Sequence, residues 1–515
     1  MECSGAPVEI QAPPSKSLSH RALTAAALAE GVSVIRGLSE SDDVTRTREA
    51  LAAAGAACAR GADGVWEVRG TAGPLRGDGD RVVVLDAGES GTSCRLLSAV
   101  AAAGRGRFLV RGEGRMDKRP MGALTAVLER LGARCEFYGE RGHTPFLLVA
   151  SGLEAPPAGT EEARGASGGC PEAAGGARAG REPAVTAVDC AETGQYLSGL
   201  LLAAPLSRTG LRLRSASRHI ASLPYIGLTL EVMAAFGADF RIERLPARGA
   251  ASRRVESAEA VAARPNGAEG TLFSMPAGRV EPAGLAEAVA ACPNGAEDIL
   301  FAVPAGRYRA AEYNVEGDWS GASYFLAAGA VGSRAVRVAG LNPHSLQGDA
   351  VFLRLLENMG ARTARDAGGV TVFPSRLKGI RVDVGDCPDL APTLAALAAH
   401  ASGPTILTNA ANLRFKESDR IAAPAGELPK VGCAVTVTDD GMVIVPPEGG
   451  PRRPGGDVVF SAYNDHRMAM SLALLGLPGR GGKGFAVRSD NPGCVAKSFP
   501  NFWECWERLG VAPCL

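Results

Sequence analysis

The segment ANLRFKESDR, residues 411–420, crowds basic and acidic side chains together in a chain that is 21% charged overall. If the segment is helical, Asn412, Lys416 and Arg420 share one face and Glu417 lies beside them. Side chains of this kind can bind the phosphate or carboxylate groups of small molecules. A solvated helix face with local ion pairs is the alternative interpretation, so the other motifs have to decide between the two.

Two more polar motifs stand where helices are expected to begin. PPSKSLSHR places Lys16, Ser17 and Arg21 at the first of them, but it lacks the GxxxxGK[ST] pattern of a P-loop, which argues against a nucleotide site. AGESGTSCR supplies a glycine turn, Gly88 and Gly91, whose backbone amides could cradle an anion. An ordinary tight turn would use the same glycines.

Three basic motifs occur elsewhere in the chain. EGRMDKRPM holds Arg119 directly before a proline at a helix start, where an exposed surface is the alternative. DHRMAM puts His466 and Arg467 at the mouth of an apolar helix, and a capping His with a structural Arg is the other interpretation. CVAKSFPNFW contributes Lys497, which is unremarkable by itself.

Neither the acidic motifs nor the cysteines predict a metal site. DVGDCPDLAPT holds Asp383, Asp386 and Asp389, but the calcium-loop pattern is missing, and N-capping of the next helix is the simplest structural use of Asp389. The 12 cysteines show no CxxC pairs and no zinc spacing. We therefore expect no metal and no cofactor.

The composition argues against nucleic-acid and membrane partners. The 55 basic and 55 acidic residues balance, and no basic block stands out. No apolar run reaches the roughly 18 residues that a membrane span needs, and MECSGAPVEIQ lacks the regions of a signal peptide. We expect a cytoplasmic protein, and at 515 residues we expect more than one domain.

Six expected helices end in a glycine followed by a small or apolar residue, which indicates an internal repeat. These glycines are Gly55, Gly132, Gly237, Gly360, Gly432 and Gly510. Their intervals are 77, 105, 123, 72 and 78 residues. The two long intervals contain a low-complexity stretch at 153–184, expected to be a disordered surface loop, and a duplication in which PNGAEGTLFSMPAGR recurs as PNGAEDILFAVPAGR.

A second series of six helices is rich in Ala and Leu and nearly uncharged, so we expect these helices to be buried. They begin at SLSHRALTAAALAEG, GTSCRLLSAVAAAG, GQYLSGLLLAAPL, SGASYFLAAGAVG, LAPTLAALAAHASG and DHRMAMSLALLGL. Short β-branched runs between the helices predict strands. The chain thus divides into six α/β units, grouped as three and three, and polar residues cluster at the helix starts. Converging helix N-termini would create an electropositive cavity for phosphorylated or carboxylated small molecules.

Ten stretches, in order over nearly the whole chain, resemble the 5-enolpyruvylshikimate-3-phosphate synthase family. They are SKSLSHRAL, GTSCRLL, RMDKRPM, GQYLSGLLLAAPL, SLPYIGLTL, VEGDWSGASYFLAAGAV, DCPDLAPTLAALAAHASGPT, NLRFKESDR, YNDHRMAMSLALL and CVAKSFPNFW. The resemblance implies an α/β, two-domain enolpyruvyl transferase fold, an inside-out α/β barrel of six βαβαββ units with the active site in the interdomain cleft. The expected domains are residues 1–14 plus 316–515, and residues 15–315 with insertions at about 153–184 and 265–307.

The resemblance also implies a reaction and its substrates. The family transfers enolpyruvyl from phosphoenolpyruvate to the 5-hydroxyl of shikimate 3-phosphate and releases phosphate, so two small polyanions are the expected partners of a protein that we expect to be a monomer. By motif position, the phosphoenolpyruvate contacts would be Lys16, Gly91, Arg119, Gln195, Arg420, Arg467 and Lys497. The shikimate 3-phosphate contacts would be Ser17, Arg21, Thr193, Gln195, Ser222, Tyr225, Asp389, Asn412 and Lys416.

By the same resemblance, the catalytic residues would be Asp389, Glu417, Lys16 and His466. Asp389 would accept the proton of the 5-hydroxyl, and Glu417 would protonate the methylene carbon. A proton donor near pH 7 needs a raised pKa, whereas adjacent basic side chains lower it. We therefore expect bound anions and partial burial to compensate at Glu417.

Some positions depart from the family pattern, and two alternative functions stay open. Glu89 stands where an Asn is common, which places a negative charge near a phosphate; His20 replaces an Asn, and Gly194 removes a hydroxyl. Pro14 and Pro429 occur where backbone freedom or a helical N–H is expected, and Pro429 should kink its helix. The alternatives are a UDP-N-acetylglucosamine enolpyruvyl transferase, although no loop cysteine lies near RMDKRPM, and a degenerate non-catalytic metabolite-binding homologue.

Overall fold

The structure is a computed structural model. It describes residues 6–77, 81–155, 183–217, 219–244, 270–275, 299–452, 458–479 and 484–511. The stretch expected to be an insertion at 153–184 therefore lies largely outside the described residues, as does much of the stretch at 265–307.

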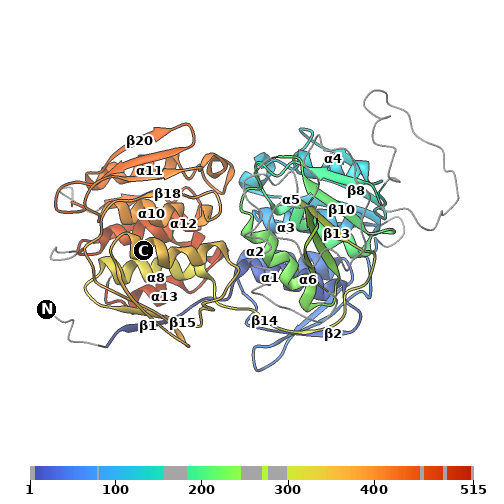
Figure 1. Cartoon of the computed structure of the whole chain (residues 1–515), viewed down its shortest axis with the longest axis horizontal. Helices are drawn as coiled ribbons and strands as arrows, with labels where there is room; N and C mark the ends of the chain where they lie inside the picture. The colour runs from blue at the N-terminus through green and yellow to red at the C-terminus, as the bar shows by residue number, and fades with distance from the viewer. Residues whose placement is uncertain are drawn as a thin grey trace.

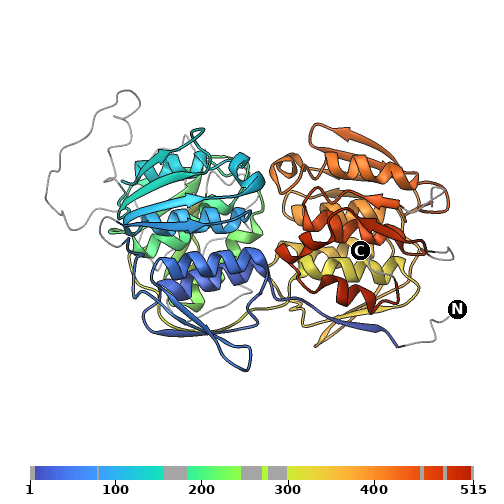
Figure 2. The same cartoon turned by 180° about the vertical axis from the view of Figure 1, so that it is seen from behind.

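Two lobes lie side by side (Figure 1), and Figure 2 shows the same division from behind. Buried apolar side chains form two separate clusters, one drawn from residues 18–313 and the other from residues 8–12 together with 319–506. We call residues 15–315 lobe one and the remaining described residues lobe two. We propose that these lobes are the two domains expected from the sequence.

The described residues form six small sheets, and every sheet contains one parallel pair of strands. In five sheets, antiparallel strands extend this pair on one side. Lobe one contains β14(Glu312–Asn314)-β2(Val32–Arg36)-β4(Trp66–Arg69)-β3(Ala57–Arg60), β5(Val82–Asp86)-β6(Arg105–Arg111)-β8(Phe146–Ser151)-β7(Arg134–Phe137) and β12(Gly270–Met275)-β11(Phe240–Arg244)-β13(Ile299–Val303)-β10(Leu211–Ser215)-β9(Val185–Val188). Lobe two contains β1(Val8–Gln11)-β15(Val336–Ala339)-β17(Gly369–Phe373)-β16(Arg362–Asp366), β18(Arg381–Asp383)-β19(Thr405–Thr408)-β21(Gly441–Val445)-β20(Ala434–Thr438) and β22(Val458–Phe460)-β23(Val487–Ser489).

All six apolar helices expected from the sequence are present and buried along most of their length, which confirms the prediction. They are α1(Lys16–Leu28), α3(Gly91–Ala102), α5(Gln195–Ala203), α8(Trp319–Val331), α10(Ala391–Ala398) and α12(His466–Leu472). Within lobe one, α3 packs on α1 and α5, and within lobe two, α10 packs on α8 and α12. Because these helices carry small residues and almost no charge, they can pack together in the middle of each lobe.

A second helix accompanies each buried helix in the chain and ends near one of the six glycines. These helices are α2(Asp42–Ala53), α4(Gly122–Arg130), α6(Pro224–Ala235), α9(Phe352–Asn358), α11(Ala422–Glu427) and α13(Phe502–Glu507). All six glycines have φ angles between +77° and +107°. Glycine adopts this left-handed conformation without a Cβ clash, so the predicted helix ends are confirmed. The 3₁₀ turns are η1(Gly114–Lys118), η3(Ala204–Leu206), η6(Gly348–Val351), η7(Pro388–Leu390), η8(Ala411–Phe415), η9(Leu428–Val431), η10(Ala473–Gly476) and η11(Pro492–Lys497).

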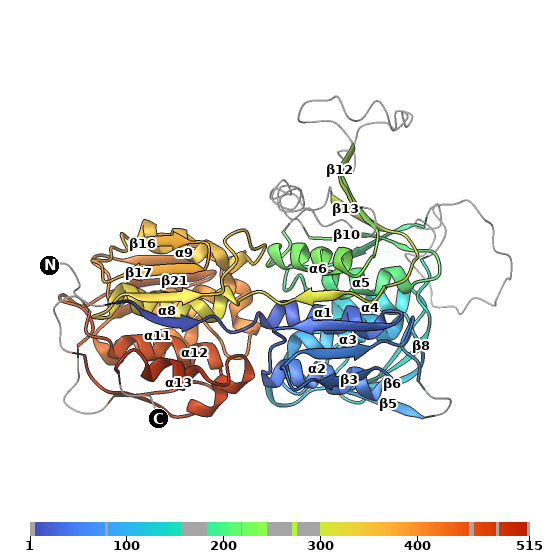
Figure 3. The same ribbon diagram turned by 90° about the horizontal axis from the view of Figure 1, so that it is seen from below.

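Two adjacent chain segments connect the lobes, as Figure 3 shows. The first strand of the chain, β1, belongs to lobe two, and the chain then enters lobe one at α1. It returns after β14, and the two crossings pair with each other through an isolated bridge between Pro14 and Gly317. The N–H of Asp318 also donates to the carbonyl of Pro13 at 2.7 Å. The bridge fixes both crossings at one point beside the start of α1.

The duplicated stretch contributes two strands to one sheet. The first copy contains β12 and the second contains β13, and both pair antiparallel with β11, on opposite sides of it. Since β13 also pairs with β10, the second copy is a central strand of lobe one. Residues 299–303, which belong to the insertion expected at 265–307, therefore form an integral strand of the sheet.

The helical interpretation of residues 411–420 is wrong. The segment forms the 3₁₀ turn η8 and then irregular backbone, and the next α-helix, α11, begins at Ala422. Asp419 interrupts the helix because its carboxylate accepts the backbone N–H groups of Ile421 and Ala422, each at 3.0 Å. At Pro429 the chain passes from α11 into the 3₁₀ turn η9, which agrees with the expected break.

Candidate active site

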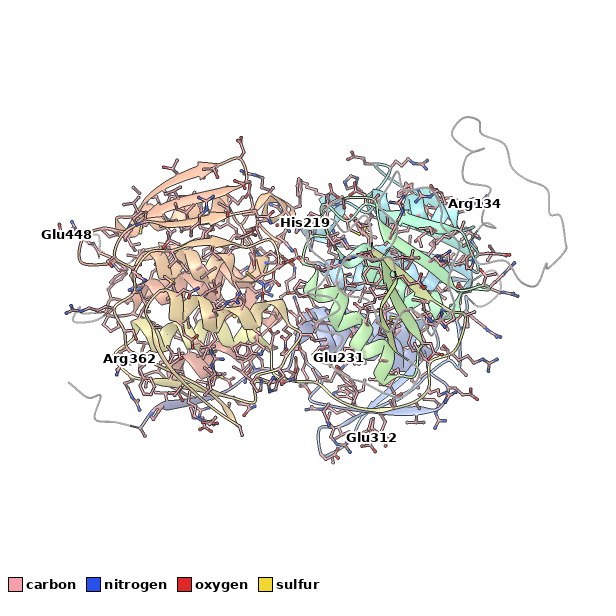
Figure 4. The ribbon with its side chains drawn as sticks, in the orientation of Figure 1. Arg134, His219, Glu231, Glu312, Arg362 and Glu448 are labelled. Atoms are coloured by element: carbon pink, nitrogen blue, oxygen red, sulfur yellow. The ribbon has the colours of Figure 1, made fainter. Side chains whose placement is uncertain are left out.

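A cleft between the lobes gathers side chains from distant parts of the chain. The empty space within it is about 630 Å³, with the open solvent at its mouth included. Figure 4 shows side chains of both lobes reaching this boundary, with His219 labelled at the edge of lobe one. The lining residues are Lys16, Ser17, Asp43, Gly91, Thr92, Arg119, Thr193, Gly194, Gln195, Ser222, Tyr225, Pro388, Asp389, Lys416, Glu417, Arg420, His466 and Arg467.

Five of the six buried helices begin at this cleft. Helix α1 begins at Lys16, α3 at Gly91, α5 at Gln195 and α12 at His466, while α10 directly follows the turn that holds Asp389. A helix N-terminus carries free N–H donors and a partial positive charge. The convergence of these ends therefore favours anionic ligands, as the sequence indicated.

Side-chain caps hold three of these helix starts in place. The hydroxyl of Ser15 caps α1, the hydroxyl of Ser90 caps α3 and the carboxylate of Asp465 caps α12. All three capping residues are buried. Ser and Asp are strong N-caps because their oxygens satisfy N–H groups that lack helical partners. The first residues of these three helices, Lys16, Gly91 and His466, line the cleft.

Arg420 is the centre of an ion-pair network at the floor of the cleft. Its side chain is 1% exposed and donates to Asp389, Glu417 and Asp465, each with a shortest distance of 2.8 Å. Arg467 donates to the second oxygen of Asp389 at 2.6 Å. The charge run at 411–420 is therefore not a solvated helix face at Arg420, because this side chain is buried and paired with carboxylates from other segments.

The network sets the ionisation of the two carboxylates proposed for proton transfer. Burial raises the pKa of Asp389, but Arg467 and Arg420 outweigh burial and hold that pKa well below its usual range. Burial likewise raises the pKa of Glu417, but Arg420 and Arg119 outweigh burial and hold that pKa well below its usual range. The basic neighbours thus favour the ionised form of both carboxylates. Partial burial alone does not give Glu417 the raised pKa that a proton donor needs, so bound anions would have to neutralise its basic neighbours.

Two other titratable side chains that line the cleft, Lys416 and His466, have lowered pKa values. Burial lowers the pKa of Lys416 to about 8, although Asp389 opposes this shift. Burial also lowers the pKa of His466 well below its usual value, and Lys16 and Arg467 act in the same direction. Both ring nitrogens of His466 are buried without a hydrogen-bond partner among the described residues. A neutral imidazole in this position can donate to or accept from a bound molecule.

The structure brings most of the residues predicted for the site to one place. Those that line the cleft are Lys16, Ser17, Gly91, Arg119, Thr193, Gln195, Ser222, Tyr225, Asp389, Lys416, Glu417, Arg420, His466 and Arg467. Asp389 does not cap α10, whose N-cap is Leu390. Its carboxylate instead accepts from Arg420, Arg467 and the hydroxyl of Tyr225, so the capping alternative is wrong.

Three predicted residues do not line the cleft directly. Arg21 is buried beneath it, where it donates to the carbonyls of Ser17 and Tyr225, so its contacts suit a residue that positions the cleft wall. Asn412 is half-buried, and its Oδ1 has no partner among the described residues. Lys497 is 9% exposed and donates to Glu89 of the other lobe.

Sequence reasoning did not single out two residues of the cleft wall, namely Asp43 and Pro388. Asp43 is the more informative of them because its carboxylate accepts from Lys16 at 2.9 Å. The acidic pair at the start of α2 was its only sequence signal, and acidic residues in a first helical turn are common for a different reason, the helix dipole.

Asp349 is a further buried carboxyl near the cleft, on η6. It is 2% exposed, its Oδ2 accepts from the hydroxyl of Ser320, and its Oδ1 has no partner among the described residues. Burial raises the pKa of Asp349 to about 7, and the negative charge of Asp389 acts in the same direction while Arg467 opposes it. Asp349 therefore takes up a proton more readily in the folded chain than in the unfolded chain.

This shift predicts a pH dependence of stability. Between about pH 4 and pH 7 the unfolded chain loses the Asp349 proton and the folded chain keeps it, so stability falls as pH rises, by up to about 4 kcal/mol. We expect Asp349→Asn to remove this part of the dependence, so that the variant gains stability relative to the parent between pH 5 and pH 8. Urea unfolding at both pH values measures the difference. Asp63→Asn, which changes an exposed loop carboxyl, is the control, and an equal difference at both pH values would contradict the assignment.

Metal-binding clusters and membrane-spanning helices are both absent from the described residues. In the described part of the chain, no group of three or more His, Cys, Asp or Glu side chains is arranged to hold a metal ion. No helix in the described ranges is both long enough and apolar enough to cross a membrane.

The chain is similar to proteins of one family along almost its whole length. The family model described as EPSP synthase (3-phosphoshikimate 1-carboxyvinyltransferase) matches residues 6–155 and 295–506. A 3-phosphoshikimate 1-carboxyvinyltransferase of Methanosphaerula palustris is 35% identical over 503 residues, which cover 97% of this chain and 96% of that protein. A protein of the same name from Thiobacillus denitrificans is 35% identical over 504 residues, with the same coverage.

Solved structures show the same fold. The EPSP synthase of Acinetobacter baumannii superposes with a TM-score of 0.66 at 24% identity and covers 98% of this chain and 96% of its own. The enolpyruvyl transferase NikO of Streptomyces tendae has a TM-score of 0.60 at 18% identity and covers 98% of this chain and 94% of its own. The two-domain enolpyruvyl transferase architecture expected from the sequence is thereby confirmed.

Proposed function

Because the chain belongs to the EPSP synthase family, we propose that it transfers the enolpyruvyl group of phosphoenolpyruvate to the 5-hydroxyl of shikimate 3-phosphate and releases phosphate. The chain is then an enzyme, a 3-phosphoshikimate 1-carboxyvinyltransferase of the shikimate pathway of aromatic amino-acid biosynthesis. The alternative acceptor is UDP-N-acetylglucosamine.

One observation carries the proposal, namely the convergence of basic side chains and helix N-termini on a single cleft between the lobes. Both substrates are polyanions, and like charges have to be brought together before they can react. A single cation 4 Å from a phosphate contributes about 4 kcal/mol at an effective dielectric of 20, before desolvation. Several cations in one enclosed site can therefore overcome the repulsion between two anionic substrates.

We propose that Asp389 and Glu417 move the protons. The oxygen of the 5-hydroxyl attacks C2 of phosphoenolpyruvate, Asp389 accepts the hydroxyl proton, and Glu417 donates a proton to C3, which forms the tetrahedral adduct. Loss of phosphate from C2, and return of a proton from the C3 methyl group to the carboxylate of Glu417, then regenerate the double bond. The ionised state of Asp389 suits the first step. Glu417 lies beside Arg420 and Arg119, and its proton affinity rises when substrate phosphates neutralise those cations.

The division of binding residues between the two substrates follows the family motifs and is part of the proposal. Arg119, Arg420 and Arg467 supply guanidinium groups that suit bidentate contacts with phosphate or carboxylate. Gln195 is pre-oriented because its side chain accepts from Arg95 at 2.7 Å and donates to Thr92 at 3.0 Å. The monomeric state, the cytoplasmic location and the lack of a metal or cofactor stay predictions.

A phosphate-release assay tests the function. Purified protein with phosphoenolpyruvate should release inorganic phosphate when shikimate 3-phosphate is present and should release none with UDP-N-acetylglucosamine as acceptor. Release with the UDP-sugar alone would assign the sister activity. No release with either acceptor, from folded protein that binds both substrates, would identify a non-catalytic homologue.

Gly91→Ala is expected to weaken the use of phosphoenolpyruvate. A Cβ on Gly91 would lie 2.7 Å from the guanidinium group of Arg119, so that group has to shift. We expect KM for phosphoenolpyruvate to rise by about tenfold, which corresponds to about 1.4 kcal/mol of binding energy, with a smaller change in kcat. Steady-state kinetics measure both constants. The matched control is Gly122→Ala at the first position of α4, where the nearest heavy atom to a Cβ is 3.8 Å away, and an unchanged KM for Gly91→Ala would contradict the role of Arg119.

A further inference from the structure

Glu89 of lobe one contacts lobe two, two residues before Gly91 of the cleft wall. It lies in the turn between β5 and α3, and its carboxylate accepts from the amide of Asn464 at 3.1 and 3.2 Å. The same carboxylate accepts from the ammonium group of Lys497 at 3.2 Å, and so does the backbone carbonyl of Glu89. These contacts join residues that are 375 and 408 positions apart in the chain.

The backbone around Glu89 holds the carboxylate in this position. Gly88 has a φ of +52°, and the N–H of Glu113 donates to the Gly88 carbonyl at 2.8 Å. Gly114 packs directly against the Glu89 carboxylate, with no room for a Cβ between them. On the other side, Asn464 is itself held by the amide of Asn491 at 3.0 Å. The Glu89 side chain is 31% exposed, so solvent reaches it although both sides of it are packed.

Lys497 is the cation that this carboxylate neutralises. Burial lowers the pKa of Lys497, but Glu417, Asp43 and Glu89 outweigh burial and raise that pKa above its ordinary value. The ammonium group is therefore charged, and two of its three N–H groups are directed to Glu89 oxygens. Lys497 does not line the cleft itself, but the carboxylates of Glu417 and Asp43, which do, act on its pKa. An anion that binds beside Glu417 therefore approaches a cation that already has an anionic partner.

We infer that Glu89 limits the affinity of the site, because its carboxylate competes with phosphoenolpyruvate for Lys497. The inference rests on the proposed function, because it takes phosphoenolpyruvate as the anion that arrives at Lys497. The incoming phosphate or carboxylate group has to displace the Glu89 carboxylate or share the ammonium group with it. Glu89 thereby weakens the binding of every small anion at this end of the cleft, inorganic phosphate included.

The variant Glu89→Gln tests the competition, because glutamine keeps the length of the side chain and an oxygen for Asn464 but carries no charge. We expect KM for phosphoenolpyruvate to fall by about threefold to tenfold, the scale of a partly exposed ion pair, while kcat stays unchanged. Isothermal titration calorimetry with inorganic phosphate should show a fall in Kd of the same size. The matched control is Glu113→Gln, a neighbouring carboxylate that is 57% exposed and pairs with Arg46, and it should change neither constant.

A double-variant cycle with Lys497→Met shows whether the effect passes through Lys497. If it does, Glu89→Gln lowers the Kd of inorganic phosphate in the parent chain and leaves it unchanged in the Lys497→Met chain. An unchanged or raised Kd and KM in Glu89→Gln would overturn the inference. An equal fall in the Kd of inorganic phosphate when Glu89→Gln is added to Lys497→Met would also overturn it. Because phosphate binding needs no turnover, calorimetry decides the role of Glu89 even if the phosphate-release assay refutes the proposed function.

Discussion

Glu417→Gln is expected to lower kcat by about 10²- to 10⁴-fold, the usual contribution of a positioned proton donor, while both substrates still bind. Glutamine has the shape of the carboxyl group but no acidic proton for C3 of phosphoenolpyruvate. Arg420 keeps its contacts with Asp389 and Asp465 in the variant, so the floor of the cleft should stay in place. Steady-state kinetics give kcat and KM, and calorimetry with shikimate 3-phosphate reports binding separately.

The control for this experiment is Glu427→Gln. Glu427 is a buried carboxylate of the same lobe that pairs with Lys430 at 2.6 Å and accepts from Tyr463 at 3.0 Å. It does not line the cleft, so its loss of charge should leave kcat unchanged. Full turnover in Glu417→Gln would remove Glu417 from the mechanism. An equal loss of kcat in both variants would instead point to a general effect of removing buried charge in lobe two.

Arg420→Met is expected to lower the free energy of unfolding by about 3 to 5 kcal/mol and to abolish turnover. The side chain is 1% exposed and pairs with three carboxylates that are themselves buried or nearly so. Methionine fills a similar volume but leaves these carboxylates without their shared cation. Removing one partner of a buried ion pair costs more than the pair itself contributes, since the remaining charge stays desolvated. Urea unfolding followed by circular dichroism measures the loss.

The pH dependence separates this electrostatic cause from a simple packing defect. The carboxylates that lose Arg420 should have raised pKa values in the variant, so protonation should restore part of the stability as the pH falls from 7.5 to 5. The control is Arg414→Met in the same segment, whose side chain is 34% exposed and pairs with Asp419 at 3.5 Å. This variant should lower the free energy of unfolding by less than about 1 kcal/mol. The network would not stabilise lobe two if Arg420→Met lowered the free energy of unfolding no more than Arg414→Met does. A loss that does not change with pH would lead to the same conclusion.

The elements of the fold could be predicted because their signals are local. The 3.6-residue spacing of apolar side chains and the six closing glycines identify twelve helices without reference to any contact between segments. Ten motifs in order identified the family, and eight of them contribute residues to one cleft. Periodicity failed at residues 411–420, where a single side chain, Asp419, satisfies the backbone N–H groups that a continuous helix would have used.

The sequence by itself determined which segments form helices and strands, and that their polar ends carry anion-binding side chains, because both properties depend on neighbours in the chain. Only the tertiary structure decided which charges meet. Arg420 pairs with Asp389 and Asp465, and Lys497 pairs with Glu89 at a separation of 408 positions. It also decided that Arg420 and Arg119 lie close enough to Glu417 to lower its pKa. Coulomb energies depend on distance in space and on burial, and both quantities are set only when the chain has folded.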